Sequence, residues 1–102
     1  MPTVAEALQH LNRELAHAQQ TGCKVLKLIH GYGSSGAGGD IRIAVQRRLT
    51  EMTGGGEIRV CIFGEHWAKS DEQAWALMNA RPELKKDHDL GKRNLGITIV
   101  VL

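Results

Sequence analysis

The sequence predicts one small α/β domain. Apolar residues recur at helical spacing near the N-terminus and again after residue 40. Short runs of β-branched and aliphatic residues at 25–29, 58–63 and 96–102 predict strands. The chain has 102 residues, which is enough for one core but too few for two lobes with a cleft between them. We therefore expect a single domain spanning residues 1–102.

The first predicted helix begins at a capping box. In Thr3-Val4-Ala5-Glu6 the threonine side chain can accept from the helix backbone while the glutamate bonds back to the cap. The helix should end near Gly22, and its apolar stripe comprises Val4, Leu8, Leu11 and Leu15. No strand is visible in the sequence before this helix.

A second helix follows the strand 25–29 and a glycine-dense loop. Asp40 is a suitable N-cap, and the helix should end at Gly54-Gly55-Gly56. Its apolar positions are Ile41, Val45, Leu49 and Met52. The next strand, 58–63, completes a strand, helix, strand order, which predicts a parallel pair with a right-handed crossover.

Residues 64–95 form a long excursion before the closing strand. Asp71 can cap a short helix there, whose apolar face should lid the core. Residues 84–93 mix lysines with Asp87 and Asp89, and we favour a solvated loop over a ligand-binding role. The closing strand 96–102 is too continuously apolar to be an exposed edge.

Composition narrows the functional class. No apolar stretch is long enough to cross a membrane and no signal peptide is visible, so a cytoplasmic location is expected. Cys23 and Cys61 are far apart in sequence, which predicts reduced thiols and no zinc site. His10 and His17 lie seven residues apart, without the spacing of a helical metal pair. A net charge of +2 permits polyanion binding without demanding it.

The glycine-dense loop is the main candidate for a binding site. It runs from His30 through Gly31-Tyr32-Gly33-Ser34-Ser35-Gly36 toward the second helix. Glycines lack the Cβ atom that would keep a ligand from the backbone. Backbone N–H groups and the positive end of the helix dipole should face whatever enters the loop. We therefore expect an anion, above all a phosphate, to bind here.

Better-known glycine motifs match this loop only in part. The segment 31–36 fits the dinucleotide pattern G-x-G-x-x-G, but further glycines delay the helix and the chain lacks room for both mononucleotide halves. The histidine-glycine pair is also found in oxyanion loops of α/β-hydrolases, yet no G-x-S-x-G nucleophile elbow exists. The lysine of a phosphate P-loop is absent. Acyl transfer and nucleotide hydrolysis are therefore disfavoured.

The whole constellation resembles the Smr domain, the small MutS-related domain family. The residues that carry the resemblance are 28–33, which match the family's HGxG motif, Ile41-Arg42 with Val45 and Leu49 in the following helix, and the closing strand 96–102. The family's first motif, LDLH, lies on a strand before the first helix and has no counterpart in this sequence.

The resemblance implies a two-layer α/β sandwich with a small mixed β-sheet and two main helices. This architecture is similar to the C-terminal domain of translation initiation factor 3. The resemblance also implies binding or nicking of DNA or RNA. Without the LDLH strand, the sheet should have an uncovered edge, and such edges invite pairing, so a homodimer is one expectation.

Each candidate site residue has a functional and a structural interpretation. His30 can bind a phosphate oxygen, act as a general acid or base, or only hydrogen-bond the loop. Arg42 can contact a phosphate or pair with Asp40 or Glu65. Tyr32 can stack on a base or cover the loop. The hydroxyls of Ser34 and Ser35 can donate to phosphate, but serine is common in such loops.

We favour a DNA- or RNA-binding domain in which the phosphate backbone contacts the loop and the basic second helix. The first alternative is an endonuclease with His30 as acid or base, for which magnesium would be the expected cofactor if one is used. The second alternative is a protein-interaction module that uses Trp67 and Trp75. No other cofactor and no resident metal are expected.

Overall fold

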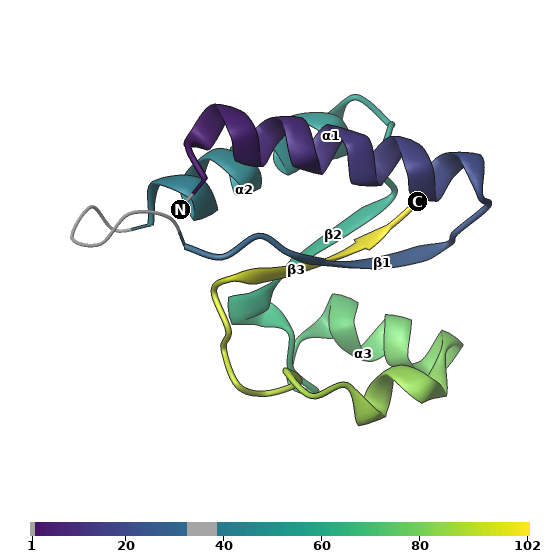
Figure 1. Ribbon diagram of the computed structural model, residues 1–102. Helices are drawn as coiled ribbons and strands as arrows, with labels where there is room; N and C mark the ends of the chain where they lie inside the picture. Colours follow the sequence, from purple (N-terminus) through teal and green to yellow (C-terminus); the bar gives the residue numbers. More distant parts are fainter. Residues whose placement is uncertain (1, 33–38) are drawn as a thin grey trace.

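Helices and strands alternate along the chain in the computed structural model, which describes residues 2–32 and 39–102 (Figure 1). The α/β class expected from the sequence is confirmed. No helix in these residues is long and apolar enough to cross a membrane. The elements are α1 (Val4–Gln20), β1 (Val25–Ile29), α2 (Asp40–Gly54), β2 (Val60–Phe63), η1 (Gly64–His66), α3 (Glu72–Ala80), η2 (Pro82–Lys86) and β3 (Ile97–Val101), where η marks a 3₁₀ helix.

The strands form a sheet with the order β1-β3-β2, and both pairings are antiparallel. The expectation of a mixed sheet with a directly paired β1 and β2 is therefore wrong. These two strands run in the same direction, but β3 lies between them, with Val101 opposite both Val25 and Val60. The physical reason is the composition of β3, because a continuously apolar strand is most stable where both faces and both edges are covered.

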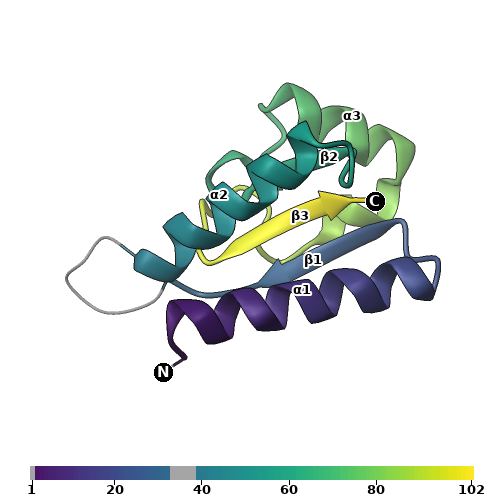
Figure 2. The ribbon, with the colours of Figure 1, turned by 90° about the horizontal axis from the view of Figure 1, so that it is seen from above.

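Helices α1 and α2 cover one face of the sheet (Figures 1 and 2). The capping box at α1 is present, with the two bonds between Thr3 and Glu6 both 3.1 Å long. Val4 and Leu8, the outer members of the expected stripe on α1, are half-buried against this core. The core consists of Leu11, Leu15, Leu28, Ile41, Val45, Leu49, Met52, Ile58 and Val100.

The excursion packs on the opposite face of the sheet and adds a third layer (Figure 1). Its helix α3 is capped by Asp71, as expected, through a 3.0 Å bond to the backbone of Ala74. The excursion does more than lid the first core, because it buries an apolar cluster of its own. That cluster contains Ile62, Trp67, Ala74, Met78, Ile97 and Ile99.

A partly buried ionic network joins the excursion to β1. Lys27 Nζ lies 3.0 Å from Asp87 Oδ1 and 2.6 Å from Asp89 Oδ2. The indole of Trp67 donates to Asp87 Oδ2 at 3.0 Å, and Asn94 donates to Asp89 at 3.0 Å. Burial opposes the charge of Lys27, but its bonds to the two carboxylates outweigh that effect and raise its pKa. The interpretation of residues 84–93 as merely solvated is therefore wrong for the two aspartates.

Candidate functional site

His30 follows β1 directly and turns the chain away from the sheet. The backbone N–H groups of His30 and Gly31 both donate to Gly96 C=O at 3.0 Å. Gly31 has a backbone φ of +76°, which residues that carry a side chain rarely adopt. A Cβ atom on Gly96 would approach Gly31 Cα to 3.3 Å. The two glycines therefore let the turn after β1 pack closely against the start of β3.

Both nitrogens of the His30 ring are engaged inside the protein. Nδ1 lies 2.8 Å from Gly31 C=O and Nε2 lies 3.0 Å from the Thr98 hydroxyl, which is fully buried. A carbonyl can only accept, so Nδ1 carries the proton and Nε2 accepts from Thr98. Burial lowers the pKa of His30, outweighing the bonds that raise it. This geometry favours the interpretation in which a neutral His30 fixes the shape of the turn.

Arg42 joins the first turn of α2 to η1. Its Nη1 lies 3.6 Å from Glu65 Oε2 and 3.4 Å from Gln46 Oε1, and Gln46 donates to Glu65 Oε1 at 2.9 Å. The pairing with Glu65 that the sequence offered as an alternative is therefore present. The Arg42 side chain keeps 22% of its surface exposed, so it remains reachable from solvent.

The start of α2 differs from the expectation. Gly39, with a φ of +79°, occupies the N-cap, and Asp40 is the first helical residue. The Asp40 carboxylate accepts from Ile41 N–H at 2.9 Å, and Tyr32 C=O accepts from Arg42 N–H at 3.0 Å. Two of the first-turn amides expected to face a phosphate are therefore already bonded within the protein. A left-handed glycine can take the cap here because the helix amides find other acceptors.

The other predicted site residues are placed only in part. Tyr32 is exposed beside the start of α2. Gly33, Ser34, Ser35 and Gly36 lie outside the described residues, so their expected phosphate contacts remain predictions.

A hollow of about 410 Å³ lies on the α1 side of the His30 turn. Ile29 and His30 line it from the strand end, while Gln9, His10 and Arg13 line it from α1. The sequence pattern did not predict that α1 lies beside the glycine-dense loop. Thr98 also escaped prediction, although a single hydroxyl inside an apolar strand could have indicated a buried hydrogen-bond partner.

Among the described residues, no group of three or more His, Cys, Asp or Glu side chains could hold a metal ion. Trp67 is fully buried and only Trp75 of the two tryptophans is exposed, with Lys85 Nζ 5.4 Å from its ring centre. A protein-interaction surface could therefore use the indole of Trp75 but not that of Trp67.

The elements around this site are also those that match a known family. A family model described as the Smr domain matches residues 1–61, which include α1, β1, the His30 turn and α2. No curated protein and no solved structure matches the chain. The likeness to the C-terminal domain of translation initiation factor 3 stays a prediction. The match covers more than half of the 102 residues, and the chain belongs to the Smr domain family.

Proposed function

We propose that this Smr domain binds DNA or RNA through the phosphate backbone, at the turn after β1 and along α2. Smr domains are generally nucleic-acid-binding or nuclease-related. The observation that carries the proposal is the placement of Arg42, which lies beside the HGxG turn and is partly exposed. Its Nη1 lies 3.6 Å from the Glu65 carboxylate, so on contacting a phosphate Arg42 must either leave this carboxylate or bind both groups. Arginine suits this role because its planar fork binds two phosphate oxygens at once.

Further positive charge supports this position. Arg47 and Arg48 are exposed on α2, and Arg13 lines the hollow next to His30. In the proposal, Gly31, Tyr32 and residues 33–36 contact the phosphate backbone of the nucleic acid. His30 maintains the conformation of the turn and does not itself contact the phosphate. Contacts of this kind are tolerant of sequence and sensitive to salt.

Binding of labelled duplex DNA and single-stranded RNA, measured by fluorescence anisotropy between 50 and 300 mM salt, tests the proposal. Arg42→Ala should weaken binding and reduce the slope of log affinity against log salt by about 0.7–0.9, the value for one lost phosphate contact. Arg59→Ala is the matched control, because Arg59 is exposed and precedes β2 at the opposite end of the sheet. Equal effects of both changes, or affinity indifferent to salt, would contradict the proposed surface.

A double variant extends the test to α2. Arg47→Ala with Arg48→Ala should weaken binding more than Lys69→Ala with Lys86→Ala, which removes the same charge from exposed positions of the excursion. If the two double variants lose equal affinity, net charge alone explains the binding and α2 is not its site.

For the nuclease alternative we expect little or no cleavage. Hydrolysis needs an activated nucleophile and a proton donor for the leaving oxygen, and both nitrogens of His30 are already bonded. A plasmid-relaxation and RNA-cleavage assay, with and without magnesium, on the parent and on His30→Ala tests this. Cleavage by the parent that vanishes in the folded variant would make His30 catalytic.

The cytoplasmic location stays a prediction.

A further inference from the structure

Glu65 lies at the end of the sheet where the His30 turn leaves β1. Strands β1 and β2 both pair antiparallel with β3, so they end on the same side of the sheet. The His30 turn follows β1 there, and η1, which carries Glu65, follows β2. Helix α2 begins at the same end (Figure 1). The fold therefore brings Glu65 next to Arg42, in the first turn of α2, although the two residues are far apart in the sequence.

Two side chains of α2 contact the Glu65 carboxylate. Gln46 Nε2 donates to Oε1 at 2.9 Å, and Arg42 Nη1 lies 3.6 Å from Oε2. Arg42 Nη1 also donates to Gln46 Oε1 at 3.4 Å, because the two residues are four apart and share one side of the helix. The bond from Gln46 therefore fixes the carboxylate with its second oxygen toward Arg42.

The contact between Arg42 and Glu65 is an ion pair and not a hydrogen bond, because 3.6 Å exceeds the usual hydrogen-bond distance. A guanidinium group carries five N–H donors in a planar fork. Arg42 can therefore contact a phosphate while Glu65 stays in place. In that arrangement the carboxylate remains as a fixed negative charge beside the bound anion.

Both charges are partly shielded from solvent and act on the HGxG turn. The Arg42 side chain is 22% exposed and that of Glu65 is 28% exposed, so water screens them less than it screens fully exposed groups. Burial lowers the pKa of His30, while the charge of Glu65 raises this pKa and the charge of Arg42 lowers it. The pair therefore lies close enough to the turn to affect an anion bound there.

The positive charge of Arg42 is offset at the turn itself. Glu65 supplies one negative charge, and the carboxylate of Asp40 lies in the same first turn of α2. His30 is neutral, as described above, and the exposed Arg47 lies farther along the helix. An anion bound at Arg42 therefore meets little excess positive charge.

Such a site distinguishes anions by their charge. A ligand with two negative charges loses more hydration on binding than a ligand with one. Where positive charge is in excess, a stronger Coulomb attraction offsets this loss, because the attraction is proportional to the charge of the ligand. Beside a nearly neutral pair the doubly charged ligand has no such gain. The geometry therefore favours a singly charged anion at Arg42.

We propose that Glu65 makes the Arg42 site selective for phosphodiesters, which carry one negative charge, over phosphomonoesters, which carry about 1.5 to 2 negative charges at pH 7. This selectivity rests on the proposed function and narrows its ligand. Internal phosphates of a strand are favoured, whereas terminal phosphates and mononucleotides bind more weakly. Glu65 does not contact the phosphate and acts through Arg42, whose charge it offsets.

Dimethyl phosphate and methyl phosphate are suitable probes, because at pH 8 they differ in charge and only slightly in size. Arg42 Nε is buried, so the NMR signal of its N–H can report binding at this side chain. At constant ionic strength, the parent should bind dimethyl phosphate at least as tightly as methyl phosphate. Glu65→Gln removes the charge but keeps an oxygen that can accept from Gln46. It should tighten dimethyl phosphate about threefold, which is typical of a partly exposed pair, and methyl phosphate about ninefold, because the doubled ligand charge squares the effect.

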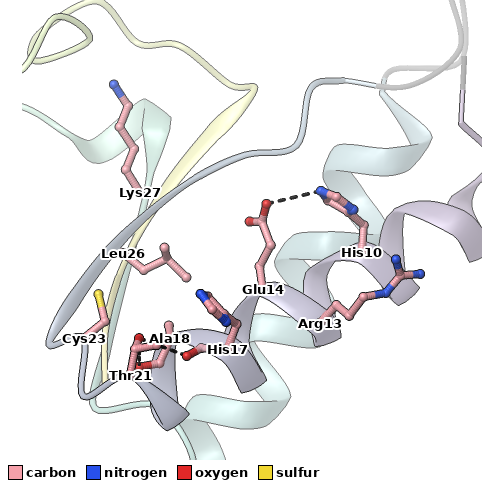
Figure 3. A pocket seen from close by; sticks show the side chains of 9 residues that line it. All are labelled: His10, Arg13, Glu14, His17, Ala18, Thr21, Cys23, Leu26 and Lys27. Carbon is pink, nitrogen blue, oxygen red and sulfur yellow. Dashed lines mark hydrogen bonds and ion pairs between the residues drawn. The ribbon is translucent and has the colours of Figure 1, made fainter.

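Two control variants separate this effect from structure and from net charge. Glu65→Asp keeps the carboxylate and should keep the preference for dimethyl phosphate. Glu14 pairs with His10 on α1 at 3.2 Å (Figure 3). Glu14→Gln therefore removes the same charge without touching the Arg42 pair, and it should leave the ratio of the two affinities unchanged. Thermal melts of each variant confirm that it is folded.

Three results would overturn the selectivity. Glu65→Gln could tighten both probes by the same factor, or Glu14→Gln could act as strongly, and either outcome would reduce Glu65 to a contribution to net charge. Glu65→Gln could weaken both probes, which would show that the carboxylate positions Arg42 for binding. The Arg42 signal could respond to neither anion, which would exclude a phosphate site at this side chain.

Oligonucleotide binding, measured in parallel by anisotropy, separates this selectivity from the proposed function. If Arg42 distinguishes the two probes but no oligonucleotide binds, the proposed function is wrong and the charge selection by Glu65 stands. If oligonucleotides bind through Arg42 but Glu65→Gln leaves the ratio of the two probes unchanged, the proposed function stands and the role of Glu65 is wrong.

Discussion

We predict that replacing His30 lowers the stability of the fold more than it weakens nucleic-acid binding. His30→Ala removes ring bonds of 2.8 and 3.0 Å and leaves the hydroxyl of Thr98, which is 0% exposed, without its partner. The lost bond to Gly31 costs about 1 kcal/mol net, and the buried Thr98 hydroxyl left without its partner costs about 1–3 kcal/mol. We therefore expect the free energy of unfolding to fall by about 2–4 kcal/mol. For a domain of this size, 2 kcal/mol corresponds to a Tm decrease of about 8–16 °C.

A double-mutant cycle with Thr98→Val isolates the bond between the two side chains. Valine has a shape similar to threonine without the hydroxyl, so it removes the unsatisfied group left by His30→Ala. Urea unfolding of the parent, both single variants and the double variant should give a coupling of about 1 kcal/mol between positions 30 and 98. The double variant should therefore lose less stability than the sum of the single variants.

Two results would contradict a structural role for His30. If His30→Ala changes the free energy of unfolding by less than about 0.5 kcal/mol, the ring bonds do not support the fold. If the same variant then loses oligonucleotide binding, His30 contacts the ligand directly. Binding measured well below the Tm of the variant keeps the two effects apart.

The remaining predictions concern pH, the ionic network, a close contact and a thiol. The fold lowers the pKa of His30, so the contribution of its neutral ring to stability should be complete above the unfolded-state pKa of about 6.5 and should be lost as the pH falls below that value. Urea unfolding at pH 7.5 and 5.0 should show this loss of stability in the parent but not in His30→Phe. Lys27→Met should cost about 1–3 kcal/mol, less than a fully buried pair, since its side chain is 26% exposed; a neutral result in urea unfolding would show that the network does not support the excursion. Gly64→Ala should cost at least about 2 kcal/mol, because a Cβ atom there would overlap the backbone carbonyl of Asn94, and an unchanged Tm would exclude this contact. Burial raises the pKa of Cys61 to about 12, so iodoacetamide at pH 8 should label it at least tenfold more slowly in the folded protein than in urea.

The sequence alone determined the elements that depend on local patterns. The capping box at Thr3 and the cap at Asp71 both form at the expected positions, because each needs only residues within one helical turn. The burial of Ile41, Val45 and Leu49 follows from their spacing on α2. The resemblance to the Smr family also came from the sequence, and the family match over residues 1–61 includes the HGxG segment and the start of the following helix.

Tertiary structure decided what depends on residues far apart in the chain. The position of β3 between β1 and β2 follows from the burial of both its faces, which the order of elements along the chain does not specify. Asp87 became a partner of Lys27, 60 residues away, because the excursion folds back over the sheet. The bond from His30 to Thr98 spans 68 residues, so no local pattern could assign it. Local spacing fixes which residues can share a face, but only packing determines which of those faces meet.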